Sequence, residues 1–531
     1  MSSSHSSHPE DEERAGLLSG SEPGRKNARN KLLVIILGVI GISLIVIGLT
    51  AIWADQKLPI KRNVILMISD GFGPASETFA REYYQYVNDL KYNYMTPLDE
   101  ILVGSSRTRS SDSLVTDSAA GATAFSCAKK TYNGAIGVDP DKFPCGTILE
   151  AAKAIGMVTG LVATSRITHA TPASFSAHVV LRAMEDSIAL QQVGNYPLGK
   201  QVDLMFGGGK CYFLPNTSSG SCRSDERNLL QEAEEGGFKN LLTRNEFDVI
   251  DTSSVKLPLM GLFTLDHMSY EIDRDQNVEP SLKEMAKKAL DILESNNDKG
   301  FFLMIEGSRI DMAAHDNDPG THVHEILAYH ETISVVRKFV DEHPGTVLIS
   351  VSDHETGGLS LARQTAPNYP QYRWFPDVIS RIKNSSYILA TQLRSYWDDD
   401  RISFINKTIL NDGLGINDFT QDDLDYLNQN LTKQSYIDYL ANLTSWRAEL
   451  GWATHGHSSV DVNLYAYGMN IEALRGNHEN TDIGEFIKNY LNLDLDDITL
   501  KLNSNNASFH LSNVNISNYN ADHLEHYHHL H

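Results

Sequence analysis

The sequence lacks an excess of basic residues: 45 Lys and Arg stand against 68 Asp and Glu in 531 residues, a net charge of −23. Non-specific nucleic-acid binding needs a basic surface, so this balance argues against a nucleic-acid partner. Compositional bias is also lacking, because 41% of the residues are apolar and 21% are charged. This usage excludes a wholly disordered, collagen-like or polytopic membrane protein. The length suits one large α/β domain or two ordinary domains.

A long uncharged run of Leu, Ile and Val covers 32–54. As a helix it is long enough to cross the ~30 Å hydrocarbon core of a bilayer. A signal peptide is the alternative, but an apolar stretch this long after thirty polar residues fits one poorly. Basic residues at 25–31 place the N-terminus in the cytosol. We therefore expect a disordered cytosolic tail over 1–31, a transmembrane signal anchor over 32–54 and a lumenal part from 55 onward.

Cysteine is rare, and all four Cys follow the apolar run. Four Cys allow three pairings. Because we expect an oxidising lumen, we favour the two local disulfides, Cys127–Cys145 and Cys211–Cys222; the alternative is four buried thiols. Seven Asn-x-Ser/Thr sequons, all after the run as well, are candidate glycosylation sites. These are Asn216, Asn384, Asn406, Asn430, Asn442, Asn506 and Asn515.

The two ends of the chain carry further signals. Glu13, Leu17 and Leu18 form an acidic-dileucine pattern that resembles the signal read by sorting adaptors for vacuole- or lysosome-bound cargo. The segment 501–531 is rich in Asn and Ser and then in His. Clustered His binds metals in some proteins, but we expect a solvated, removable tail here.

Short apolar runs alternate with helical patterns from residue 62 onward. Val64–Ile68, Phe301–Ile305 and Val347–Val351 are examples, and each ends in polar residues. Apolar strands alternating with helices predict an α/β fold with a mainly parallel central sheet covered by helices on both faces. The segment 365–450 is richer in Tyr, Asn and Asp, and we expect it to form an inserted cap.

Metal-ligating side chains follow several of these strands directly. Asp70, Glu306 and the pair Asp353-His354 come just after apolar runs. Ligands of α/β sheets bind beyond the carboxyl ends of the strands, so these groups predict a metal site. Asp311 and His315 have the i, i+4 spacing that places a carboxylate and an imidazole on one helix face. An ordinary surface pair is the alternative for that spacing.

Ser118 precedes a run of small residues that predicts a tightly packed helix. A helix N-terminus stabilises a phosphate or an alkoxide, although Asp117 or Ser118 acting as an N-cap explains the same pattern. No Gly-x-Ser-x-Gly elbow surrounds Ser118, so metal activation is the better-supported route to a nucleophile.

Two further side chains suit phosphate chemistry. Thr171 offers a hydroxyl ligand for a hard cation such as Mg²⁺, and Arg182 offers a planar fork for two phosphate oxygens. A Thr-Pro helix start and a surface Arg are the alternatives. Gly207–Lys210 lacks the spacing of a P-loop, so we interpret it as a turn after a strand.

Together these motifs resemble the alkaline phosphatase family, in the family's order, over about 60–468. The motifs are Asp70–Gly73, Asp117–Ala124, His169–Ala173, Glu306–His315 and Ser352–Gly358. The resemblance implies a phosphomonoesterase of broad specificity. Ser118 matches the nucleophile that becomes phosphoserine, and Arg182 matches the phosphate-binding Arg. It also implies a homodimer with two zinc ions and one magnesium ion per subunit.

The resemblance assigns the metal ligands residue by residue. They are Asp70, Asp353 and His354 for the zinc beside the serine; Asp70, Thr171 and Glu306 for magnesium; and Asp311, His315 and a later His for the other zinc. The spacing to Asp461 and Gly468 favours His457 as that His, with His455 as a competitor. His169 stands where the bacterial branch has Asp, and Met312 where it has Lys. Bacterial magnesium affinities and pH optima therefore do not transfer.

Three other functions fit the sequence less well. A sulfatase needs a Cys/Ser-x-Pro-x-Arg motif, which Ser118 lacks. A phosphodiesterase of the same superfamily usually has a Thr nucleophile, and a binding protein with a dead site would have lost ligands. The tail, span and dileucine pattern together resemble a membrane-anchored vacuolar member of the family. That resemblance implies a vacuole-membrane location with a lumenal catalytic domain, and trimming past about 500.

Overall fold

The computed structural model describes residues 24–55 and 61–504. The chain forms two compact units, 1–60 and 61–531, and each is treated by itself. The dileucine pattern, the last two sequons and the His-rich end lie outside the described residues.

The described part of the first unit is helix α1 (Gly24–Asp55). Its stretch 27–44 is long and apolar enough to cross a membrane, and none of that stretch is buried. The helix begins eight residues before the predicted start at Leu32, because Arg, Lys and Ala in 25–31 are good helix formers. The predicted tail and the helix therefore overlap at 24–31.

The second unit is built on a ten-stranded sheet in the order β14-β2-β13-β8-β1-β7-β3-β4-β6-β5. All neighbouring strands pair in parallel except β13, which runs antiparallel to β2 and β8. The predicted α/β class with a mainly parallel sheet is confirmed. The strands are β1 (Asn63–Ile68), β2 (Leu102–Arg107), β3 (Val158–Arg166), β4 (Leu204–Gly208), β5 (Lys239–Leu241), β6 (Leu259–Leu262), β7 (Phe301–Glu306), β8 (Thr346–Val351), β13 (Val462–Gly468) and β14 (Gly476–Glu479).

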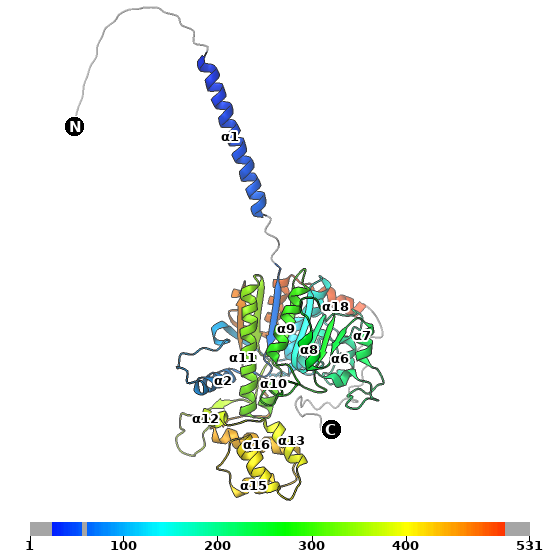
Figure 1. Ribbon diagram of the computed structural model, residues 1–531, viewed down its shortest axis with the longest axis vertical. Helices are drawn as coiled ribbons and strands as arrows, with labels where there is room; N and C mark the ends of the chain where they lie inside the picture. The colour runs from blue at the N-terminus through cyan, green and yellow to red at the C-terminus, as the bar shows by residue number, and fades with distance from the viewer. Residues whose placement is uncertain (1–23, 56–60, 505–531) are drawn as a thin grey trace, which may run out of the picture. The chain divides into compact units, whose positions relative to one another are not determined.

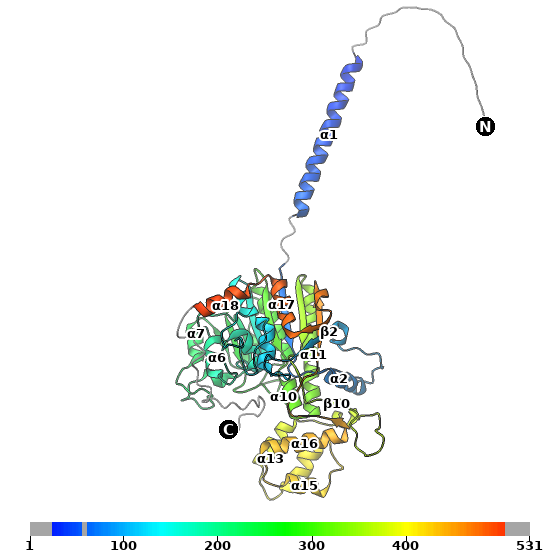
Figure 2. The same cartoon turned by 180° about the vertical axis from the view of Figure 1, so that it is seen from behind.

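Two hydrophobic layers cover the two faces of this sheet. Alternate residues of a strand point to opposite faces, so Ile65 and Met67 of β1 join one layer, and Val64 and Leu66 join the other. The first layer is closed by α2 (Pro74–Val87), α9 (Leu282–Ser295) and α11 (Pro319–Glu342), and α9 and α11 lie in front of the sheet in Figure 1. The opposite view shows α17 (Asn480–Leu491) and α18 (Leu495–Ser504) on the other face (Figure 2).

The remaining elements complete both layers and the loops. They are α3 (Ser118–Cys127), α4 (Ile148–Ala154), α5 (Ala170–Ser176), α6 (Glu185–Gln192), α7 (Leu229–Glu235), α8 (Arg244–Val249), α10 (Arg309–His315) and the 3₁₀ segments η1 (Asp99–Ile101), η2 (Lys210–Phe213) and η4 (Ile471–Leu474). Helix α18 runs past the boundary expected at residue 500, because Ile498 and Leu502 are buried in the second layer. Helix α18 is thus part of the folded core.

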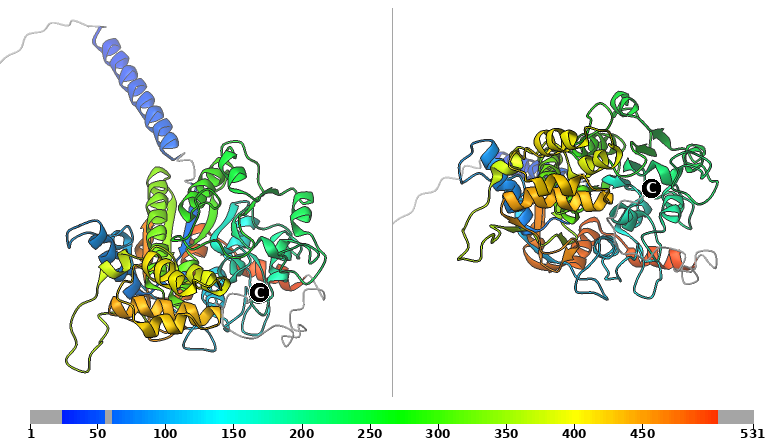
Figure 3. Two further views of the ribbon diagram at one scale, coloured as in Figure 1. Left: turned by 60° about the horizontal axis from the view of Figure 1, so that its bottom comes forward. Right: turned by 90° about the horizontal axis from the view of Figure 1, so that it is seen from below.

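The segment expected to be an insertion contributes no strand to the large sheet. It stands on two short ladders, β9 (Glu355–Thr356) with β12 (His457–Ser458) and β10 (Ser360–Leu361) with β11 (Leu450–Gly451). Between β10 and β11 it is helical, and its helices gather below α10 (Figure 1) and face the viewer when the molecule is seen from below (Figure 3). They are α12 (Pro376–Ser380), α13 (Ser386–Ser395), α14 (Arg401–Phe404), the π-helical η3 (Ile405–Gly413), α15 (Gln421–Leu427) and α16 (Lys433–Arg447).

Candidate metal centre

Ser118 is the first residue of α3, and the preceding residue caps the helix in its place. Asp117 Oδ1 accepts a hydrogen bond of 2.9 Å from the Ala120 amide, and Oδ2 accepts one of 2.7 Å from the Gly134 amide. The N-cap interpretation is therefore correct for Asp117. Ser118 is fully buried, and its hydroxyl does not cap the helix but is directed at Asp70 and His354.

The Ser118 hydroxyl lies in a pocket made by the ends of two adjacent strands. Asp70 follows β1, and Asp353 and His354 follow β8, which pairs with β1 in parallel. His354 Nε2 lies 3.4 Å from Asp70 Oδ1, 3.4 Å from Asp353 Oδ2 and 3.1 Å from Ser118 Oγ. Ser118 Oγ also donates to Asp70 Oδ1 at 3.4 Å. A Cβ on Gly121 would lie 2.9 Å from Asp353 Cβ, so only glycine lets α3 approach this closely.

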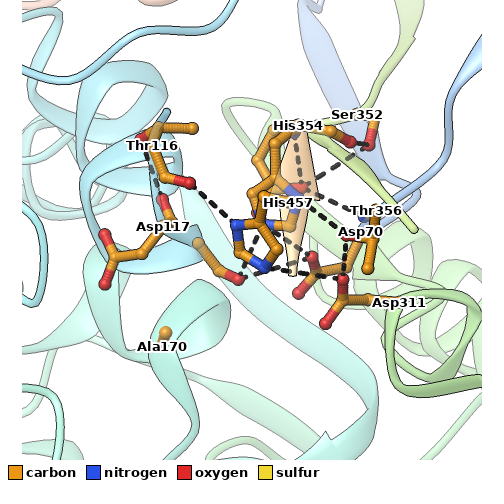
Figure 4. A network of polar contacts seen from close by, with 12 residues as sticks. Asp70, Thr116, Asp117, Ala170, Asp311, Ser352, His354, Thr356 and His457 are labelled. Atoms are coloured by element: carbon orange, nitrogen blue, oxygen red, sulfur yellow. Dashed lines mark hydrogen bonds and ion pairs between the residues drawn. The ribbon is translucent and has the colours of Figure 1, made fainter. Parts of the chain in front are cut away.

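A second pocket is made by α10 and the short strand β12. Asp311 Oδ1 and His315 Nε2 lie 3.4 Å apart on α10, as the i, i+4 spacing predicts. His457 Nε2 lies 3.0 Å from His315 Nε2 and 3.8 Å from Asp311 Oδ1. The Nδ1 of His457 is 2.8 Å from the Thr116 carbonyl oxygen, which orients the ring toward the site (Figure 4). His455 instead turns its Nδ1 to the His315 carbonyl oxygen, 2.7 Å away.

A third group shares Asp70 with the first pocket. Asp70, His169 and Glu306 offer ligand atoms within 4.8 Å of one another. Glu306 ends β7, which pairs with β1, so the sheet brings the two carboxylates together. The Thr171 hydroxyl acts to lower the pKa of Glu306 and hence lies beside it. Sequence reasoning did not propose His169 as a ligand, although its place two residues before Thr171 at the start of α5 was a signal.

Arg182 closes the site beside Ser118. Its Nη1 lies 3.4 Å from Asp117 Oδ2, and its Nη2 lies 3.1 Å from His169 Nε2. The side chain is 12% exposed, so little water surrounds the guanidinium, and its charge acts to lower the pKa of Asp70. This places a fixed cation within reach of an oxyanion bound near the serine.

The electrostatics of this edge favour bound cations. Burial raises the pKa of Asp70, and the neighbouring carboxylate of Asp353 raises it further. Burial also raises the pKa of Asp353 to about 7 and of Glu306 to about 8. It lowers the pKa of His354 to about 3, so the ring is neutral and holds a lone pair for a metal.

Buried ligand atoms at this edge also lack partners. Within the residues that the structure describes, five such atoms accept or donate no hydrogen bond: Asp70 Oδ2, His169 Nδ1, Thr171 Oγ1, Glu306 Oε1 and Asp353 Oδ2. Unpartnered buried oxygens and nitrogens are costly unless an ion satisfies them. Mixed nitrogen and oxygen donors suit Zn²⁺ in the first two groups, and the third group, to which the Thr171 hydroxyl adds an oxygen beside the two carboxylates, suits Mg²⁺.

Away from this edge, the structure forms both local disulfides, Cys127–Cys145 and Cys211–Cys222, as predicted. Four of the five described sequon asparagines are exposed: Asn216, Asn406, Asn430 and Asn442. Asn384 is half-buried, and its amide donates to Asp273 Oδ1 at 3.5 Å.

A serine at a helix N-terminus, ringed by buried carboxylates and neutral imidazoles at the carboxyl edge of an α/β sheet, defines a metallohydrolase class of site. The family model for alkaline phosphatase matches residues 61–493. The chain is 51% identical over 447 residues to an alkaline phosphatase of Schizosaccharomyces pombe, covering 83% of each chain. It is 46% identical over 517 residues to the repressible alkaline phosphatase of Saccharomyces cerevisiae, covering 91% of each.

A solved structure gives the same result. The cold-active alkaline phosphatase of a psychrophilic Shewanella superposes with a TM-score of 0.70 at 32% identity, covering 81% of this chain and 99% of that one. The chain belongs to the alkaline phosphatase family and is an enzyme of that class.

Proposed function

We propose that this enzyme is a phosphomonoesterase of broad specificity. It hydrolyses phosphate monoesters to an alcohol and phosphate through a phosphoserine at Ser118. The observation that carries the proposal is the position of the Ser118 hydroxyl, 3.4 Å from Asp70 Oδ1 and 3.1 Å from His354 Nε2, while Asp117 caps the helix. The broad specificity follows because the described side chains of the site address the phosphoryl group.

Two zinc ions and one magnesium ion per subunit fit the three pockets. Asp70, Asp353 and His354 would hold the zinc beside the serine, and Asp311, His315 and His457 the other. Asp70, Glu306 and Thr171 would hold magnesium. A variant alkaline phosphatase from the Antarctic bacterium TAB5, a structural relative at 27% identity, holds magnesium in its third metal site. Bound metal ions would lower the pKa of the serine hydroxyl and of water, and would neutralise charge on the phosphoryl oxygens.

Ser118 and Arg182 have different roles in the reaction. Ser118 Oγ forms a bond to phosphorus as the bond between phosphorus and the ester oxygen breaks, and the departing alcohol takes up a proton. Arg182 binds two phosphoryl oxygens and stabilises their charge as the bond order changes. Water then attacks the phosphoserine, phosphate departs, and Ser118 recovers its proton. Each half-reaction displaces one oxygen at phosphorus in line with the other.

The location of the enzyme is part of the same proposal. Helix α1 would anchor it as a single-pass type II protein of the vacuole membrane with the catalytic unit in the lumen, and Glu13, Leu17 and Leu18 would bind a sorting adaptor. Support comes from the apolar stretch of α1. We further propose a homodimer, glycosylation at exposed sequons and removal of a C-terminal segment. Because α18 is packed into the core, trimming would fall after Ser504.

The test is a trapped intermediate. The folded unit, residues 61–531, is incubated with a ³²P-labelled aryl phosphate and quenched in acid, where phosphoserine survives. Label is expected on the wild type and not on Ser118→Ala. Ser126→Ala, on the same helix with its hydroxyl on a backbone carbonyl, is the matched control and should stay labelled. Equal labelling or full turnover in Ser118→Ala would overturn the proposal.

A further inference from the structure

The helical insertion reaches the loop that follows the second metal pocket. Gln434 Nε2, at the start of α16, donates to Asp316 Oδ1 at 3.2 Å, one residue after His315. The amide of Ser386, at the start of α13, donates to Asp318 Oδ2 at 2.7 Å. Two helices of the insertion therefore begin against the chain that leaves α10, one to three residues after His315.

Lys433, next to Gln434 at this contact, has no role among the metal-binding and phosphate-binding residues described above. Its Nζ lies 3.2 Å from the centroid of the Tyr387 ring. Tyr387 packs edge-on against Tyr270, with ring centroids 6.2 Å apart, and Tyr270 clusters with Met312 in a small buried core. The ammonium is thus separated by two aromatic rings from the residue next to Asp311.

The charge of Lys433 is not neutralised by an ion pair. Within 24–55 and 61–504, no carboxylate lies within 4.0 Å of its Nζ, although it is half-buried. Burial lowers its pKa to about 8; Asp316 and Asp266 act to raise it, and Arg309 and Arg394 act to lower it. Asp266 is already paired at 2.7 Å with an arginine of β3. An ammonium held on a ring face without a carboxylate is available to an anion from outside.

We propose that Lys433 is a specificity residue that binds an anionic group on the leaving alcohol of the substrate. The preferred class is phosphate monoesters whose alcohol carries a second negative charge, such as a carboxylate or another phosphate. This rests on the proposed function, in which Asp311, His315 and His457 form the pocket on the leaving-group side. Partial exclusion of water at Lys433 strengthens its attraction for such a charge.

The test compares neutral and anionic leaving groups on one enzyme. kcat and KM are measured for phenyl phosphate and for its 3- and 4-carboxyphenyl analogues with wild type, Lys433→Met, Lys433→Arg and Lys407→Met. Lys433→Met keeps length and packing and removes the charge. We expect it to lower kcat/KM for the carboxyphenyl substrates about 5- to 10-fold through KM, and for phenyl phosphate less than twofold. Lys433→Arg should keep the preference. Lys407 is an exposed lysine of η3, so Lys407→Met should also keep it.

Two further readouts separate charge from structure. High salt should reduce the wild-type preference, and so should a pH above about 8, where Lys433 loses its proton. An equal loss on neutral and anionic substrates in Lys433→Met would reveal a structural role and overturn the assignment, as would an unchanged ratio. A wild-type enzyme that hydrolyses neither substrate would overturn the proposed function, and this inference with it.

Discussion

Glu306 at the catalytic edge and Glu150 in α4 are both fully buried carboxylates, yet their pKa values are shifted in opposite directions. Burial acts to raise the pKa of Glu150, but His178, 2.8 Å away, and hydrogen bonds from the Thr147 amide and the Tyr196 hydroxyl outweigh it. Its pKa therefore lies below the usual value. The chain itself supplies the compensation that a buried charge needs.

Glu306 has too little compensation from the chain: Ser165 Oγ donates to its Oε2 at 3.4 Å, and the hydroxyls of Ser308 and Thr171 act to lower its pKa, but burial outweighs them. Its Oε1 has no hydrogen-bond partner in the described part of the protein, and burial raises its pKa to about 8, with the charge of Asp353 adding to the shift. The difference teaches that the catalytic edge is built around positive charge that comes from outside the chain. The buried carboxylates there lower the stability of the metal-free fold, and a bound metal ion restores that stability.

The largest effect is expected from Asp70→Asn, because Asp70 belongs to two of the three metal groups. We expect kcat/KM for an aryl phosphate to fall by about 10³-fold or more, since one substitution weakens both sites around the serine. Metal analysis should show the loss of about two ions per chain. Asp291→Asn, on the exposed side of α9, is the control and should leave both unchanged. Full metal content in active Asp70→Asn would refute the shared-ligand assignment.

Glu150→Gln tests the buried carboxylate whose charge is compensated by the chain itself. Removing one partner of a buried pair should lower the free energy of unfolding by about 3 kcal/mol or more, with the activity of the folded enzyme retained. Urea denaturation and aryl phosphate turnover measure the two effects. Glu331→Gln, an exposed change on α11, should cost little. An inactive but equally stable Glu150→Gln would contradict this structural role.

The same pair predicts a pH window for stability. The pKa of Glu150 is lowered, so its contribution to stability is present above the usual value of 4.5 and is lost as pH falls through its folded pKa. The pKa of His178 is raised, with Glu150 as the main favourable cause against burial, so its contribution is present below 6.5 and is lost as pH rises through its folded pKa. The pair should stabilise most between these values, so the stability difference between wild type and Glu150→Gln should be largest there and should shrink at lower and at higher pH.

A smaller effect is expected from Gln434→Leu, which removes the hydrogen bond from the insertion to the buried Asp316. Losing one bond to a buried carboxyl should cost about 1–3 kcal/mol locally. We expect a few-fold lower kcat and faster zinc loss from the pocket of Asp311 and His315, with the serine-side metal retained. Gln421→Leu, an exposed change on α15, should have no effect. Equal loss of all metals would show that the insertion supports the whole unit.

The sequence was enough to predict the site residues that directly follow strands of the sheet. Asp70 and Asp353 each follow a continuous apolar run, and neighbouring parallel strands bring such ends together, so both the sheet and the position of these groups were readable. The Asp311–His315 pair was readable from helical spacing. Asp117 and Ser118 could not be told apart as the cap from residue types, because that choice depends on which amide each side chain meets.

The rest depends on contacts between distant segments. Spacing in the sequence favours His457 but leaves His455 as a competitor, and the pairing of β12 with β9 brings His457 into the cluster. Glu150 and His178 meet because α4 lies beside α5, which no local pattern reveals. The role of Lys433 depends on how the insertion folds back on α10, and the start of α1 depends on helix propensity rather than on apolar character.

The most direct test of the central claim is the melting temperature of Glu306→Gln and Glu150→Gln, with metals bound and after chelation, at about pH 9. The raised pKa of Glu306 means that its charged form destabilises the metal-free fold, with the cost growing as pH rises from 4.5 to about 8. Chelated Glu306→Gln should therefore melt above chelated wild type, and metal-loaded Glu306→Gln below metal-loaded wild type. Glu150→Gln should melt lower in both states. A Glu306→Gln protein destabilised equally with and without metal would contradict a catalytic edge built to hold metal ions.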